Sequence, residues 1–147
     1  MSLTPIMTAE AISAFLDETF PQLQFGGRAY FVDAVSPGQA VMRLKAGERH
    51  LRPGGTVSGP TLFSLSDLAA YCAVLAHIGP VALAVTTDLT IHFLRKPKPG
   101  DLLCEARLLK LGKSLAVIDC AIRSEGADDL VAHAVATYSI PPREKAV

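Results

Sequence analysis

The chain has 147 residues, of which 50% are hydrophobic and 19% are charged, and 14 basic residues balance 14 acidic ones. A charged fraction below the usual figure of about 25% argues against disorder, and the balance excludes the basic surface that nucleic-acid binding requires. The length is that of one ordinary domain, so we expect a single domain over residues 1–147. The apolar surplus predicts that some surface is covered in a homo-oligomer.

The N-terminal segment and the cysteines both favour a cytoplasmic protein. Residues 1–10 lack a basic stretch followed by an apolar one, so no secretory signal is predicted. Cys72, Cys104 and Cys120 are odd in number, lie within apolar runs and show no Cys-x-x-Cys spacing. Such cysteines are typical of buried free thiols in a reducing compartment.

The first third of the chain predicts a helix, a hairpin and an irregular segment. Apolar residues recur at helical spacing over residues 8–20, with Thr8 as a plausible N-cap and Pro21 as the stop. Residues 27–35 and 39–45 alternate between apolar and polar around a Ser-Pro-Gly turn, which indicates a β-hairpin. The glycine-containing stretch that follows is expected to be irregular.

A long helix, apolar on every side, is expected over about residues 60–78. Proline tolerates the first helical position, and Ser58 or Gly59 can cap the helix. A helix without a polar face belongs in a core. The same segment is long enough for a membrane span, but Asp67 within it and the strands predicted after it favour a soluble protein with no membrane partner.

The rest of the chain predicts four strands. They are expected over residues 84–95, 101–110, 114–124 and 130–140. Short connections make them antiparallel neighbours. Strict alternation in the first strand would place Thr86 on the opposite face from Leu89 and Ile91. The order of elements predicts an α+β domain in which a curved antiparallel sheet wraps around the long helix.

Two features of the long helix could carry chemistry. An ionised Asp67 in so apolar a helix costs several kcal/mol unless it is paired, hydrogen-bonded or open to a cleft. A bond from Ser64 or Ser66 is the structural alternative, and the general link between buried ionisable groups and function favours a functional role. At the helix start, the Gly59 amide could polarise a carbonyl, although Ser58 would serve equally as an ordinary cap.

The remaining candidates point to no metal and no nucleotide. The histidines are His50, His77, His92 and His133. They are too scattered for a metal-binding motif, so we interpret them as structural and expect no metal. The chain has neither a P-loop nor a G-x-G-x-x-G motif, and the surroundings of Ser58 do not fit the G-x-S-x-G motif of serine hydrolases.

Residues 52–67 resemble the signature of hotdog-fold acyl-CoA thioesterases of the phenylacetate-degradation (PaaI) type. That family reads N-x-x-G-x-x-H-G-G, followed by a helix with an Asp nine residues after the His. Here Ser58 and Asp67 are nine residues apart, and Arg52 and Ser58 are six apart. The similarity continues through residues 85–97 and 111–114 and covers about residues 25–140. It implies a hotdog fold.

The resemblance implies roles for the residues that match the family's motif. Asp67 falls on the catalytic carboxylate, a general base or nucleophile toward the thioester. Gly59 falls on the glycine whose N–H polarises the thioester carbonyl. Thr86 matches a Ser or Thr that helps to place water from the partner subunit. Ser58 stands where the family has its His, and Arg52 stands where it has its Asn.

The resemblance also implies a substrate. The residues that match positions where relatives meet the phosphates of coenzyme A at a dimer interface are Arg95, Lys96 and Lys113. The implied protein is a dimer or tetramer that hydrolyses a small or medium acyl-CoA, with no cofactor beyond the coenzyme A of its substrate. Two alternatives stay open: a non-catalytic hotdog module that binds acyl-CoA or fatty acid, and a dehydratase, which Ser58 disfavours because such enzymes carry a His in this region.

Overall fold

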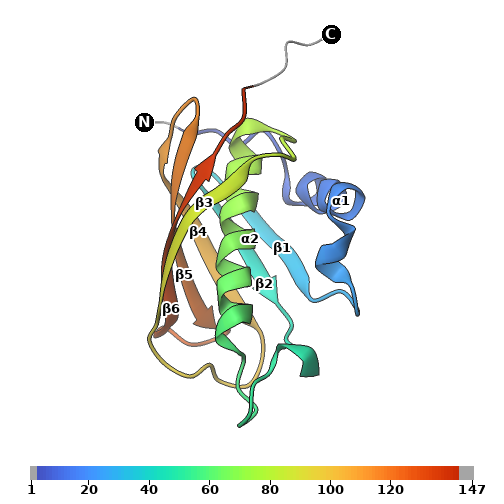
Figure 1. The fold of residues 1–147 in the computed structure, drawn as a ribbon, viewed down its shortest axis with the longest axis vertical. Coiled ribbons are helices and arrows are strands. Elements are labelled where there is room, and N and C mark those ends of the chain that lie inside the picture. The colour runs from blue at the N-terminus through green and yellow to red at the C-terminus, as the bar shows by residue number, and fades with distance from the viewer. Residues whose placement is uncertain (1–2, 143–147) are drawn as a thin grey trace.

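Six antiparallel strands and one long helix form the body of the protein in a computed structural model, which describes residues 3–142 (Figure 1). The strands are β1 (Tyr30–Ser36), β2 (Gln39–Leu44), β3 (Val85–Phe93), β4 (Leu102–Leu111), β5 (Leu115–Ser124) and β6 (Leu130–Ser139). The helices are α1 (Ala9–Thr19) and α2 (Gly59–Ile78), with the short 3-10 helices η1 (Pro21–Gln24) and η2 (Glu48–His50). Each predicted helix and strand is present, with ends within three residues of the expected ones, and the 3-10 helices are additions.

The strands form one sheet in the order β1-β2-β4-β5-β6-β3. The prediction that the four C-terminal strands are neighbours in chain order was wrong for β3 and β4: β3 pairs with β6, because residues 94–101 cross the end of the sheet instead of forming a hairpin turn. The sheet curves around α2, while α1 packs near the β1 edge (Figure 1). β3 therefore forms the other edge, and its side chains are all half-buried or exposed. This arrangement confirms the predicted α+β class and the hotdog architecture, a curved antiparallel sheet around a long central helix.

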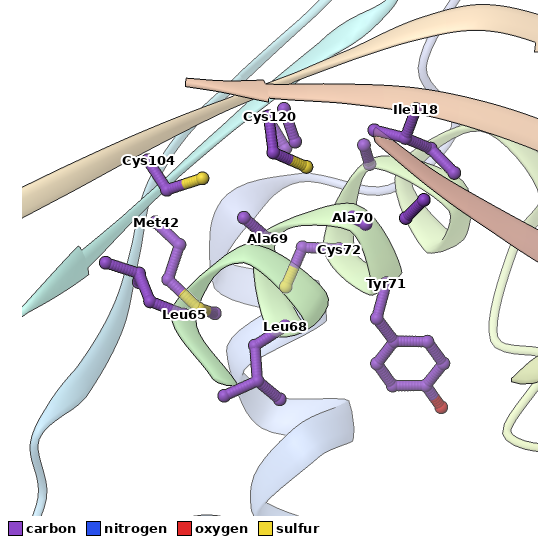
Figure 2. Close-up of a cluster of buried hydrophobic side chains, with 14 of the residues drawn as sticks. Met42, Leu65, Leu68, Ala69, Ala70, Tyr71, Cys72, Cys104, Ile118 and Cys120 are labelled. Carbon is purple, nitrogen blue, oxygen red and sulfur yellow. The ribbon is translucent and has the colours of Figure 1, made fainter. Parts of the chain in front are cut away.

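Helix α2 begins and ends at clear local signals and fills the core between them. Ser58 caps its first turn, and Gly79, with φ 97°, ends it by donating its N–H to the Leu75 carbonyl. Met42 of β2 and the cysteines of β4 and β5 point from the sheet toward α2 (Figure 2). A fully buried leucine on this helix stabilises the fold by about 1.5–3 kcal/mol.

The apolar length of α2 is explained by burial in the sheet. The helix is long and apolar enough to cross a membrane, yet 83% of its most apolar window is buried within this fold. Leu65, Ala69 and Cys72 have no exposed surface. These fully buried side chains are thus in the environment that a core helix needs.

A second expectation about β3, the face on which Thr86 lies, was also wrong, and a β-bulge is the reason. In the pairing with β6, Thr86 lies opposite Tyr138 but Asp88 lies opposite Thr137, so Thr87 is an extra residue on the β3 side. Leu89 lies opposite Ala136, two residues from Tyr138. Thr86 therefore shares the inner face with Leu89, which strict alternation would not allow.

Candidate active site

The carboxylate of Asp67 is half-buried on α2 and accepts two hydrogen bonds from the sheet. The Thr86 hydroxyl on β3 donates to Asp67 Oδ1 at 2.6 Å, and the Tyr138 hydroxyl on β6 donates to the same oxygen at 2.7 Å. Both are short bonds of the kind that charged acceptors make. The donors come from distant strands, so the structural alternative of a bond from Ser64 or Ser66 does not describe this residue.

Tyr138 is the residue of this cluster that the sequence analysis missed. It is 3% exposed, and burial, with the Asp67 carboxylate beside it, raises the pKa of its hydroxyl, which therefore stays protonated and donates. Its ring stacks on Tyr71 with centroids 6.1 Å apart. The sequence did contain one signal for this residue. Tyr138 is the last of four alternate, buried positions on β6, and the other three are Ala132, Ala134 and Ala136.

The bulge in β3 explains how Thr86 reaches Asp67. Without the extra residue Thr87, the register that places Leu89 on the inner face would turn Thr86 outward. With it, Thr86 and Tyr138 are direct cross-strand neighbours on the inner face. The two donors therefore approach one carboxylate oxygen from adjacent strands.

A cavity of about 220 Å³ opens beside this cluster. Asp67, Thr86 and Tyr138 supply polar atoms of its wall, and Phe20 and Leu68 are among its apolar lining residues. The end of α1, the middle of α2, β3 and the segment before β3 all contribute to the wall. A cleft that combines apolar walls with convergent polar groups is the usual form of a small-molecule site.

The start of α2 forms a second, separate group of candidate residues. Ser58 Oγ accepts the Thr61 N–H at 3.3 Å, so the interpretation of Ser58 as an N-cap is confirmed. Gly59 occupies the first helical position, where helix geometry leaves its amide without an intrahelical acceptor. Arg52 is exposed in the preceding turn, and its N–H donates to the Thr56 carbonyl.

The two groups do not meet within one chain. Gly59 and Asp67 are eight residues apart on the same helix, which corresponds to about 12 Å along its axis. A single thioester cannot contact both the Gly59 amide and the Asp67 carboxylate over that distance. The structure thus joins Asp67 with Thr86 and separates them from Ser58, Gly59 and Arg52.

The three basic candidates are also divided between two places. Arg95 and Lys96 are exposed just after β3, and Arg95 donates to the Leu130 carbonyl at 2.8 Å. Lys113 is exposed in the turn between β4 and β5. These two places lie at opposite ends of the sheet (Figure 1), separated by the ten residues of β4, or about 33 Å at the usual strand rise.

The buried histidines connect backbone segments, as expected for structural residues. His77 accepts the Gly38 N–H through Nε2 at 2.8 Å, and its Nδ1 lies 2.8 Å from the Ala73 carbonyl. His50 accepts the Gly47 N–H at 2.8 Å. Burial, with the nearby Arg49 charge, lowers the pKa of His50. Among residues 3–142, no group of three or more His, Cys, Asp or Glu side chains is placed to hold a metal ion.

Comparison with known proteins assigns the chain to a family. The model of the family described as "Thioesterase superfamily" matches residues 54–131, more than half of the chain. The chain belongs to the thioesterase superfamily. The matched segment contains Gly59, Asp67 and Thr86 but stops before Tyr138.

Individual relatives in the thioesterase superfamily agree with this assignment. A solved structure from Silicibacter sp. TM1040, described as a "putative thioesterase", is 51% identical with a TM-score of 0.86, over 95% of this chain and 96% of that one. Human acyl-coenzyme A thioesterase 13 is 29% identical over 100 residues, 67% of this chain and 71% of that protein. A phenylacetic acid degradation-related protein from Ralstonia eutropha JMP134 is 28% identical with a TM-score of 0.69, over 76% and 84%. The predicted family is confirmed.

Proposed function

We propose that the protein hydrolyses the thioester of a small or medium acyl-CoA. The observation that carries this proposal is the Asp67 carboxylate, bonded by two hydroxyls on one oxygen and set in the wall of a cavity that apolar and polar side chains line together. The cavity suits an acyl group, and the carboxylate supplies a base or nucleophile. The similarity to human acyl-coenzyme A thioesterase 13 supports the substrate class.

Two routes use the Asp67 carboxylate. As a general base, Asp67 takes a proton from water while the water oxygen adds to the thioester carbon. The carbon–sulfur bond then breaks, and the proton passes to the departing thiolate, which gives a free acid and coenzyme A. As a nucleophile, an Asp67 oxygen displaces the thiolate, and water hydrolyses the resulting mixed anhydride. In both routes the Gly59 amide stabilises the developing negative oxygen, with Ser58 and Arg52 as polar support beside it.

Such a site requires two copies of the chain, because Gly59 and Asp67 lie too far apart in one. We therefore propose a homodimer, or a dimer of dimers, in which the start of α2 of one copy faces Asp67 of another. Phe63 on α2 is 40% exposed and Phe93 on β3 is 55% exposed, which leaves apolar surface to cover. β3 is also an edge strand with an unpaired side. A monomer in analytical ultracentrifugation would contradict the shared site.

The phosphates of coenzyme A are proposed to meet Arg95, Lys96 and Lys113 as exposed positive charges. Since Lys113 lies at the far end of β4 from the other two, one coenzyme A meets them on different copies. The proposal includes a cytoplasmic location, no cofactor beyond the coenzyme A of the substrate, and no nucleic-acid or membrane partner.

A panel of acyl-CoAs with free-thiol detection tests this function. We expect turnover by the wild-type protein and a loss of about 10²–10⁴-fold in Asp67→Asn, the usual contribution of a positioned acid–base group. Asparagine is the matched change because its amide oxygen still accepts the Thr86 and Tyr138 hydroxyls. Undiminished turnover by Asp67→Asn would contradict the mechanism.

The alternative function is a non-catalytic module that binds acyl-CoA or fatty acid. Ser58 and Arg52, which stand where the resemblance expects His and Asn, favour it. This function predicts that acyl-CoA raises the melting temperature in a saturable way while no free thiol forms. Hydration of an enoyl-CoA would instead indicate the dehydratase.

A further inference from the structure

The geometry points to Tyr138 as the residue that positions the Asp67 carboxylate and leaves Oδ2 as its reacting oxygen. This inference rests on the thioesterase function proposed above. It adds a residue that lies beyond the segment matched by the family model, residues 54–131. It also assigns different tasks to the two oxygens of one carboxylate.

Both hydroxyl donors bond the same oxygen of Asp67. Thr86 lies 2.6 Å and Tyr138 2.7 Å from Oδ1, and the described part of the chain places no donor on Oδ2. Two donors from different strands fix the position of Oδ1 and the plane of the carboxylate. Oδ2 thus remains for the water or the thioester carbon, and its lone pairs do not have to be freed before reaction.

The Tyr138 hydroxyl also restrains the torsion angles of the Asp67 side chain. It lies 3.0 Å from the Asp67 backbone carbonyl as well as 2.7 Å from Oδ1. One phenolic hydrogen shared between these two acceptors holds the carboxylate close to its own backbone. The side chain is therefore held in one orientation before substrate binds, which is the condition for efficient catalysis by a fixed group.

Tyr138 is itself fixed and remains a donor. Its ring stacks on Tyr71 with an interplanar angle of 20°, and the Tyr71 hydroxyl donates to the Ala82 carbonyl at 2.9 Å. Burial and the adjacent Asp67 carboxylate raise the pKa of Tyr138. Its hydroxyl therefore keeps its proton at neutral pH. It can neither compete with Asp67 as a base nor repel it as a phenolate.

The hydroxyl of Tyr138 bonds Asp67, whereas its ring only fills space in the core and stacks on Tyr71. Ala132, Ala134 and Ala136 on the same face of β6 pack directly on the core. A phenylalanine at position 138 would fill the same volume and retain the stacking on Tyr71. The change Tyr138→Phe therefore removes the bond to Asp67 with little change in packing.

The test compares Tyr138→Phe with Tyr30→Phe. Tyr30 is also buried, at 8% exposed, but it lies on β1, the edge strand at the opposite end of the sheet from β6 and β3. For Tyr138→Phe we expect kcat for an acyl-CoA to fall about 10–100-fold with KM changed less than threefold. The acidic limb of its pH–rate profile should move to higher pH, because the charged carboxylate has lost a donor. Tyr30→Phe should retain the wild-type kcat and profile.

Wild-type kcat and pH profile in Tyr138→Phe would overturn the inference. If that variant does not fold, 3-fluorotyrosine at the tyrosine positions provides a second test, since a more acidic phenol is a stronger donor. The acidic limb should then move to lower pH, and an unmoved limb would overturn the inference.

A readout independent of turnover separates this inference from the proposed function. The ¹³C signal of the Asp67 carboxyl carbon, recorded by NMR at one fixed neutral pH, should change its chemical shift in Tyr138→Phe, because the carboxylate loses one of its two hydrogen-bond donors. If the wild-type protein hydrolyses no acyl-CoA, the proposed function fails while this signal still decides whether Tyr138 bonds the carboxylate. An unchanged carboxyl signal in Tyr138→Phe would overturn the inference.

Discussion

The middle and the start of α2 are held in different ways. At the middle, Asp67 is bonded by hydroxyls 19 and 71 residues away in the sequence. At the start, Ser58 and Thr61 bond each other, and both also bond the His50 carbonyl, no more than eleven residues away. The start of the helix is therefore a local structure, whereas the orientation of Asp67 depends on the whole sheet being folded. Removing a donor to Asp67 should therefore affect catalysis, whereas removing the helix cap should lower the stability of the fold in addition to any effect on catalysis.

Of the substitutions that compare these two regions below, Thr86→Val should have the largest effect, with Thr87→Val as its control. The first removes a donor to a carboxylate, and such bonds contribute about 1.5–3 kcal/mol, so kcat should fall at least about tenfold. Thr87 is exposed, and its hydroxyl donates to the backbone carbonyl of Thr137 on the neighbouring strand β6 instead of to Asp67. Its change should leave kcat within twofold. Steady-state hydrolysis of one acyl-CoA measures both, and equal losses would mean that the bulge does not select Thr86.

The features that the sequence predicts are the local ones, and the features that it misses depend on contacts between distant segments. The apolar α2, its Ser58 cap and the strands as segments of the chain depend on nearby residues, and all were predicted. The pairing of β3 with β6 rather than with β4 joins distant segments and was not predicted. Asp67 was singled out because a carboxylate in an apolar helix needs a partner. Its partner Tyr138 was missed because only the sheet pairing brings residues 71 apart together. The face of Thr86 was wrong for a similar reason: a bulge at Thr87 is set by pairing with β6 and has no signal in an alternating pattern.

A smaller effect, measured as stability, is expected at the start of α2. Ser58→Ala removes the acceptor for the Thr61 N–H and should lower the free energy of unfolding by about 1 kcal/mol. Ser64→Ala, at an exposed position inside the same helix, should leave it unchanged or raise it slightly, because alanine favours helix. Urea denaturation of the two variants measures the difference. Equal stabilities would show that the cap contributes nothing here.

The pH dependence of stability provides a finer test of the same region. Because its pKa is lowered in the folded state, His50 is neutral there when the unfolded chain begins to bind a proton at about pH 6.5. The free energy of unfolding therefore falls as the pH drops from about 6.5 toward the lower folded-state pKa. His50→Gln keeps an acceptor for the Gly47 N–H and should lose less stability than the wild type between pH 7.5 and 5.5. Urea denaturation of both proteins at the two pH values measures this. If His50→Gln loses as much stability as the wild type, the pH dependence does not come from His50.

The smallest effect on function, and the one that reports directly on how α2 opens, concerns Cys72. It has no exposed surface, and burial raises the pKa of its thiol to about 12. At pH 8 the native thiol should therefore react with Ellman's reagent only through opening of the core, whereas a Ser64→Cys thiol on the exposed side of α2 should react at once.

Above about pH 9 the unfolded thiol ionises while the folded one does not, so stability should fall as the pH rises toward 12. Cys72→Ala should reduce that alkaline loss while leaving kcat within about twofold, since the hydrogen bonds to the Asp67 carboxylate come from Thr86 and Tyr138 and do not involve Cys72. Rapid labelling of native Cys72 would mean that the middle of α2 opens as readily as its start, and the division between the two regions would fail.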